Sequence, residues 1–205
     1  ELMGAVIELG LGVATEYLSP MAESYVGDLA AWAAIGARSV ESQLHRNFIS
    51  GLSLPVGCKN SRSGSIDSAI STLVVGSHPQ QYLGIDANGQ VALIKTSGNP
   101  NCHVVLRGGS SGPNFDELSL ARLQDKLHGK DVMPEVIVDC SHGNSGSDYR
   151  KKSQIAREVA QSFQQKKLNV RGVMLESYLV EGKQKLVDPA ALVYGQSITD
   201  CCLGW

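Results

Sequence analysis

In residues 136–144, VIVDCSHGN, a run of apolar and β-branched residues ends abruptly at a polar cluster that contains His142. This order is typical of a buried strand whose end lies at a chemical site. A single histidine at a strand end is more often a hydrogen-bonded structural residue than a metal ligand. His142 is therefore a first candidate ligand, and its interpretation depends on which other residues reach the same place.

The composition excludes several classes of protein. The 205 residues carry a formal net charge of -2, without the basic excess that nucleic-acid binding requires. The longest apolar runs are strand-sized, and the N-terminus has no basic segment ahead of an apolar one, so we expect no membrane span, no signal peptide and a cytoplasmic location. Five cysteines without a CxxC pair indicate reduced thiols rather than a disulfide framework.

Short apolar segments, read as strands, alternate with amphipathic segments, read as helices. The expected strands are 11–18, 33–38, 54–60, 102–107, the segment that begins at Val136, and 170–176. The expected helices are 1–10, about 21–32, one capped by Ser39 and one opened by Ser65. A further helix has Asn114 and Glu117 as a capping box, with Phe115, Leu118 and Leu123 on its buried side. The last helix, 148–167, carries Ile155, Val159 and Phe163 on one face and ends with Lys166 and Lys167.

One segment interrupts the alternation. Apolar residues 82–85 and 91–94 flank the turn sequence Asp86–Gly89, which predicts a β-hairpin inserted at about 80–96.

Six strand–helix units predict a parallel sheet with crossover helices and both faces buried. An open doubly wound sheet and a (β/α)8 barrel both fit, although the first βα turn lacks the GxGxxG of a dinucleotide site. A complete barrel needs about 250 residues. We therefore expect one α/β domain over 1–205, truncated at both ends and part of a longer polypeptide.

The chemistry-bearing residues follow the strands. In parallel α/β folds such strand ends open on one side, so residues far apart in sequence converge. The cations Arg38, Lys59 and Arg107 suit a substrate with phosphate and carboxylate groups. The side chains of His142, Glu176 and Asp200 suit a divalent Mn, Fe, Co or Zn ion. We interpret 150–152, RKK, as a solvated helix face, and give no role to the other histidines or to the cysteine pair 201–202. The candidate set is Arg38, Lys59, Arg107, His142, Glu176 and, in the loop after the last strand, Asp200.

From about Glu16 onward the chain resembles the type I 3-deoxy-D-arabino-heptulosonate 7-phosphate (DAHP) synthases, the microbial and fungal kind regulated by aromatic amino acids. The resemblance implies a (β/α)8 barrel, here about strands 3 to 8, that condenses phosphoenolpyruvate with erythrose 4-phosphate in the first step of the shikimate pathway. The motifs that carry it are IGARSVESQLHR (35–46), LPVGCKN (54–60), LRGG (106–109), DCSHGNS (139–145), GVMLE (172–176) and YGQSITDCCLGW (194–205).

The resemblance also assigns roles. It implies that Lys59 and His142 are catalytic and that one divalent metal acts as a Lewis acid on the aldehyde oxygen. It implies a homo-oligomer, a dimer or tetramer, for the complete protein. The implied phosphoenolpyruvate-binding residues are Ala37, Arg38, Lys59 and Arg107; the metal ligands are His142, Glu176 and Asp200; the effector-site residues are Leu52, Ser53 and Tyr82.

Two departures from the family pattern matter. The fourth metal ligand, a cysteine, and a Lys-Pro-Arg-Thr segment that contacts both substrates would lie upstream of residue 1. Residues 19–24, SPMAES, differ from the usual effector-pocket segment, so the inhibiting amino acid stays open. Two alternatives remain: a non-catalytic truncated paralogue that acts as a binding or assembly module, and a 3-deoxy-D-manno-octulosonate 8-phosphate synthase, which the hairpin and the IGAR segment disfavour.

The missing parts generate a first prediction. We expect the purified 205-residue chain to form no heptulosonate from phosphoenolpyruvate and erythrose 4-phosphate, because the upstream ligand and segment are absent from it. A colorimetric assay for the heptulosonate product measures this directly. Product formation by the isolated chain would refute the prediction.

Overall fold

The computed structural model describes residues 1–86, 88–164 and 169–205. The chain divides into two compact units, each described here by itself. Unit 1 comprises residues 1–61, 65–105 and 123–135, and unit 2 comprises 62–64, 106–122 and 136–205.

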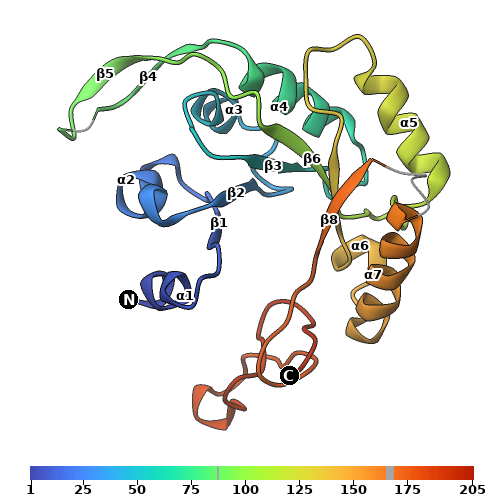
Figure 1. Cartoon of the computed structure of the whole chain (residues 1–205). Coiled ribbons are helices and arrows are strands. Elements are labelled where there is room, and N and C mark those ends of the chain that lie inside the picture. Colours follow the sequence, from blue (N-terminus) through green and yellow to red (C-terminus); the bar gives the residue numbers. More distant parts are fainter. Residues whose placement is uncertain (87, 165–168) are drawn as a thin grey trace. The chain divides into compact units, whose positions relative to one another are not determined.

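Parallel strands form the centre of unit 1, as predicted. Their order is β1 (Ala14–Glu16), β2 (Trp32–Ile35), β3 (Val56–Lys59) and β6 (Cys102–Leu106), and Figure 1 shows them side by side. The pairing runs Thr15 to Ala33, Ala34 to Gly57 and Gly57 to His103. Strands β3 and β6 are buried along their whole length, which explains why both are mostly apolar and show no alternation of apolar and polar residues.

The helices of unit 1 correct two predictions. The single helix expected over about 21–32 is three short turns, and Trp32 already belongs to β2, because Gly27 is a poor helix former in its middle. Ser42, not Ser39, caps the next helix through its hydroxyl and the His45 N–H. The helical elements are α1 (Leu2–Glu8), η1 (Pro20–Ala22), α2 (Glu23–Val26), η2 (Gly27–Leu29), α3 (Gln43–Ile49) and α4 (Asp67–Ser77).

The predicted hairpin is confirmed. Strands β4 (Gln81–Ile85) and β5 (Val91–Lys95) pair antiparallel, with Leu83 opposite Leu93. Asp86 begins the turn, in which residue 87 lies outside the described residues. At the other end of the hairpin the Thr96 N–H donates to the Gln80 carbonyl, so the ladder continues to the point where the chain returns to the sheet.

Unit 2 carries the parallel pair β7 (Val136–Asp139) and β8 (Val170–Met174), with Ile137 opposite Gly172. Among the described residues, its helical elements are α5 (Glu117–Leu127), the single turn α6 (His142–Ser145), α7 (Tyr149–Gln164) and η3 (Pro189–Ala191). The residues of α5 from Leu123 onward belong to unit 1.

Details of these helices also differ from prediction. Asp116 rather than Asn114 caps α5, because the Asn114 amide oxygen instead accepts the Gly108 N–H at 2.8 Å. Leu118 is exposed, and Leu120, Leu123 and Leu127 form the buried side. Ile155 and Val159 of α7 are buried as predicted, whereas Phe163 is half exposed, and Lys166 and Lys167 lie outside the described residues.

Among the described residues, no helix is long and apolar enough to span a membrane.

His103, for which no role was predicted, joins two strands of unit 1. The Trp32 indole N–H donates to its Nε2 at 3.0 Å, and its Nδ1 lies 3.0 Å from the Asn101 carbonyl. The imidazole must therefore be neutral, with the proton on Nδ1. Burial lowers the pKa of His103, against the opposing influences of the Asn101 hydrogen bond and the Glu135 charge.

This generates a prediction about pH. A histidine whose pKa is lower in the folded than in the unfolded state contributes stability above the unfolded value of about 6.5 and loses it as pH falls. We expect urea unfolding midpoints to drop between about pH 7.5 and about pH 5.5, and to drop less in His103→Asn.

The control is His128→Asn, which changes an exposed histidine and should keep the wild-type difference between the two pH values. An equal drop in His103→Asn and wild type would contradict this account of His103.

Candidate metal centre and substrate-binding residues

The end of β7 positions the first candidate ligand, His142. Asp139 is fully buried there, and its Oδ1 accepts the Ser141 N–H at 2.9 Å. The Asn144 amide donates to the Asp139 carbonyl at 2.8 Å and to the Leu106 carbonyl at 3.1 Å. These bonds fix the short helix α6 against the strand end, so its first residue has a defined place.

His142 itself has a strained backbone. Its φ is 51°, in the left-handed region that residues with a side chain seldom adopt. Such conformations cost about 1–3 kcal/mol and occur preferentially at functional sites. This backbone strain is independent of the sequence pattern, and it also favours a functional role for His142.

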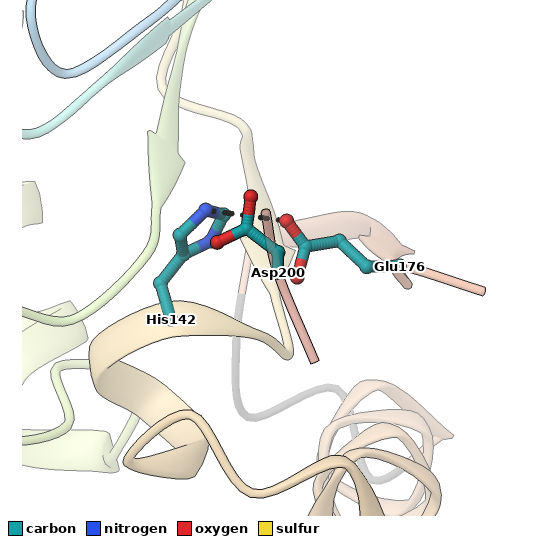
Figure 2. Close-up of side chains that lie close together, drawn as sticks. All are labelled: His142, Glu176 and Asp200. Atoms are coloured by element: carbon teal, nitrogen blue, oxygen red, sulfur yellow. Dashed lines mark ion pairs between the residues drawn. The ribbon is translucent and has the colours of Figure 1, made fainter. Parts of the chain in front are cut away.

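Three candidate ligands from distant parts of the sequence meet in unit 2. His142 comes from α6, Glu176 follows β8, and Asp200 lies in the C-terminal loop; Figure 2 shows their side chains facing one another. One ligand atom from each lies within 4.8 Å of the others. Nε2 of His142 is 3.3 Å from Oε1 of Glu176. The histidine and the glutamate are partly buried and the aspartate is exposed, so the cluster is accessible.

A carboxylate stands behind the imidazole. Nδ1 of His142 lies 3.0 Å from Oδ2 of Asp139, an ion-pair distance without the alignment of a hydrogen bond. Histidine ligands usually present their second ring nitrogen to such a carboxylate, which orients the ring and raises its basicity. The arrangement therefore directs Nε2 toward Glu176 and Asp200.

The chemistry of this donor set fits a divalent transition metal. One imidazole nitrogen and two carboxylate oxygens suit Mn, Fe, Co or Zn, and the two carboxylates would repel each other without a cation between them. Among the described residues, no cysteine joins the cluster. Cys140 is close in sequence, but burial, with a contribution from Asp139, raises the pKa of its thiol to about 12, so it stays protonated.

Arg107 follows β6 and belongs to the same unit as the candidate ligands. Burial lowers the pKa of its guanidinium, and Arg62 lowers it further, while Asp139, Glu176 and Asp200 raise it. The charges of these three carboxylates thus act on the guanidinium. Arg62 was not predicted, because its segment precedes a helix and does not end a strand.

The other two predicted cations lie in unit 1. Lys59 is the last residue of β3 and is almost fully buried; Arg38 lies three residues beyond the end of β2, with Ala37 before it. Strands β2 and β3 are parallel neighbours, with Ile35 opposite Cys58. The structure therefore brings Arg38 and Lys59 to one edge of the unit 1 sheet.

Comparison with known proteins agrees with this geometry. A family model described as "DAHP synthetase I family" matches residues 2–205. The chain belongs to this family. It is 42% identical over 202 residues to a "Putative phospho-2-dehydro-3-deoxyheptonate aldolase" of Schizosaccharomyces pombe, covering 98% of this chain and 55% of the relative.

Two further comparisons cover all or nearly all of this DAHP synthetase I chain. A "Phospho-2-dehydro-3-deoxyheptonate aldolase, Tyr-sensitive" of Salmonella typhimurium is 42% identical over all of this chain and 58% of its own length. The solved structure of the aldolase from Francisella tularensis SCHU S4 superposes with a TM-score of 0.92 at 39% identity, covering 99% of this chain and 59% of that one. The chain thus spans under three fifths of the proteins it matches.

The family assignment and the barrel fold class predicted from the sequence are confirmed by these matches. Parallel strands with an inserted hairpin, in a chain that covers part of a solved family member, correspond to part of a (β/α)8 barrel. The prediction of one domain over 1–205 and the roles given to individual site residues stay predictions.

One prediction about the site region is wrong for Lys152, although it holds for Arg150 and Lys151, which are exposed. Residues 150–152 were interpreted as a solvated helix face, but Lys152 is only 1% exposed and its Nζ lies 3.0 Å from Oε2 of Glu176. The sequence did carry a signal: Lys152 precedes Ile155 by three positions and Val159 by seven, the spacing of one helix face. The charge of the side chain concealed its place on the buried stripe.

The three segments of the predicted effector site lie in unit 1. Leu52 is buried and Ser53 exposed after α3, and the nearby Ser50 hydroxyl lies 2.7 Å from that of Thr96 beside the hairpin. Burial, and then the charge of Glu23 in the segment 19–24, raise the pKa of Tyr82. The Ser50–Thr96 contact therefore links the end of α3 to the base of the hairpin, and the charge of Glu23 acts on Tyr82 within the same unit.

The ligand cluster generates a prediction about metal binding. We expect the protein that contains this chain to bind Mn²⁺. His142→Ala should weaken the affinity by at least about 100-fold, because loss of a metal ligand should cost at least as much as loss of a residue that orients a ligand. Isothermal titration calorimetry measures the affinity of each protein. His128→Ala, at an exposed site outside the cluster, is the control; equal affinity of His142→Ala and wild type would rule out this cluster.

Proposed function

We propose that the protein containing this chain condenses phosphoenolpyruvate with erythrose 4-phosphate and water to give 3-deoxy-D-arabino-heptulosonate 7-phosphate and phosphate, the first step of the shikimate pathway. One observation carries the proposal: a His–Glu–Asp donor set lies in the same unit as a half-buried arginine, in a chain of the DAHP synthetase I family. A divalent metal held by the donor set would act as a Lewis acid on an aldehyde oxygen, and the arginine suits an anionic substrate.

The proposed phosphoenolpyruvate site draws on Arg38, Lys59 and Arg107, with Ala37 beside the first. A guanidinium presents two parallel N–H groups to a phosphate or carboxylate, and a lysine ammonium supplies a compact charge. Placing these cations around the substrate would neutralise its charge and fix the orientation of its enol carbon. Lys59 has the further catalytic role of stabilising the negative charge that moves onto the phosphate oxygens.

The candidate ligands His142, Glu176 and Asp200 would hold one divalent metal, Mn, Fe, Co or Zn. Bound there, the metal would supply Lewis acidity toward the aldehyde oxygen of erythrose 4-phosphate. The role proposed for His142 in catalysis is to present Nε2 at that place, with Asp139 behind its other ring nitrogen.

The reaction balances without a further reactant. The enol carbon attacks the aldehyde carbon and forms the new carbon–carbon bond, which leaves positive charge on the phosphate-bearing carbon. Water adds to that carbon, and the tetrahedral intermediate loses phosphate by cleavage of its carbon–oxygen bond. Cations around the phosphate stabilise it as the leaving group.

We also propose feedback control by an aromatic amino acid and assembly as a dimer or tetramer. The relatives include proteins named Tyr-sensitive and Trp-sensitive. The proposed effector site comprises Leu52, Ser53 and Tyr82, and the contact between Ser50 and Thr96 at the base of the hairpin supports it, as does the influence of the Glu23 charge on Tyr82. The segment 19–24 contributes Glu23, a carboxylate suited to the ammonium group of an amino acid.

Arg107 provides the test of the proposed function. Arg107→Lys keeps the charge but loses the two-pronged guanidinium, so we expect kcat/KM for phosphoenolpyruvate to fall by about 100-fold or more. Loss of phosphoenolpyruvate absorbance with erythrose 4-phosphate as the second substrate gives the rate.

Arg122→Lys makes the same change at an exposed position of unit 2 and should leave the rate unchanged.

In a parallel assay, arabinose 5-phosphate replaces erythrose 4-phosphate as the second substrate, to detect the octulosonate-type alternative. The proposal fails if the wild-type protein consumes phosphoenolpyruvate with neither sugar or only with arabinose 5-phosphate, and the role of Arg107 fails if Arg107→Lys is as fast as wild type.

A further inference from the structure

Lys152 is a buried cation beside the candidate ligands. It lies in the first turn of α7 and is 1% exposed. Its Nζ donates to Oε2 of Glu176 at 3.0 Å and to the Cys201 carbonyl at 2.5 Å, with the Glu176 carbonyl at 3.5 Å. Three acceptors match the three N–H bonds of the ammonium group, so its hydrogen-bonding capacity is used completely.

Packing alone does not explain a lysine at this position. Lys152 shares a helix face with Ile155 and Val159, where an apolar side chain would be buried without the cost of removing a charge from water. That cost is offset here by one carboxylate and two carbonyl groups. The acceptors belong to Glu176, a candidate ligand, and to Cys201, the residue after another candidate ligand, Asp200.

Because of the ammonium group, the two carboxylate oxygens of Glu176 have different partners. Oε2 faces Nζ of Lys152 at 3.0 Å, while Oε1 faces Nε2 of His142 at 3.3 Å. The Glu176 N–H donates to the Ser141 hydroxyl at 3.3 Å, which fixes the backbone from which the carboxylate extends. One oxygen is thus occupied by Lys152, and the other points to the cluster.

We propose that Lys152 is a positioning residue for the metal centre. It holds Glu176 so that a single oxygen, Oε1, is presented to the ion, and through the Cys201 carbonyl it fixes the loop that carries Asp200. It therefore ties together two ligands that are 24 residues apart in sequence. The inference rests on the proposed metal site and adds to it a residue that contacts neither metal nor substrate.

The test compares two adjacent lysines in the natural full-length protein. Lys152→Met removes the buried cation and keeps most of the side-chain volume, and Lys151→Met makes the same change at an exposed position. We expect Lys152→Met to bind Mn²⁺ about 10–100-fold more weakly, the usual effect of losing a residue that orients a ligand. Lys151→Met should bind as wild type does.

The visible absorption spectrum of bound Co²⁺ reports the number and arrangement of ligands. It should change in Lys152→Met and not in Lys151→Met, whereas a merely structural role would alter only the melting temperature measured in EDTA. A folded Lys152→Met with wild-type Mn²⁺ affinity and Co²⁺ spectrum would overturn the inference. If Lys152→Met does not fold, Lys152→Leu, which likewise removes every N–H donor, is judged by the same criteria.

The experiment separates this inference from the proposed function. Metal binding by wild type together with unchanged binding by the folded Lys152 variant overturns only the role of Lys152. Failure of the wild-type protein to bind Mn²⁺ or Co²⁺ overturns the metal site, and the inference with it.

Discussion

The buried carboxylate of Asp139, at the end of β7, is the constraint on which the site in unit 2 depends. One of its oxygens ends the strand by accepting the Ser141 N–H, and the other lies at ion-pair distance from His142. Its carbonyl accepts from Asn144, which holds α6 in place. These contacts surround His142, whose backbone lies in the left-handed region, so one buried residue supports both the short helix and the imidazole of the first candidate ligand.

A second constraint is the balance of charge. Asp139, Glu176 and Asp200 bring three carboxylates to one part of unit 2, an arrangement that is unfavourable without cations. Lys152 contacts Glu176 directly, and Arg107 is subject to the charges of all three. A divalent ion among the ligands and an anionic substrate at the arginine would complete this balance, which is why the metal and substrate proposals support each other.

The sequence predicted the parallel strands, the hairpin and the residues of the cluster, because each depends on a local pattern: an apolar run that ends at a polar residue, or a turn between two such runs. It did not predict the cap of α5, because Asn114 is recruited by Gly108, six residues before it in the sequence. It also placed Lys152 in solvent, because the partner that makes its burial tolerable, Glu176, follows 24 positions later. The spacing of Lys152 from Ile155 and Val159 places it on the buried face of the helix, but only its partner Glu176 shows how a charge is tolerated there.

We propose that His142, Glu176 and Asp200 hold one divalent ion. Anomalous diffraction from crystals of the natural full-length protein grown with Mn²⁺, recorded at the manganese edge, locates that ion. We expect one strong peak within coordination distance of Nε2 of His142, of Oε1 of Glu176 and of a carboxylate oxygen of Asp200. A peak beside other residues, or crystals grown with Mn²⁺ that show no peak at this cluster, would disprove the proposed site.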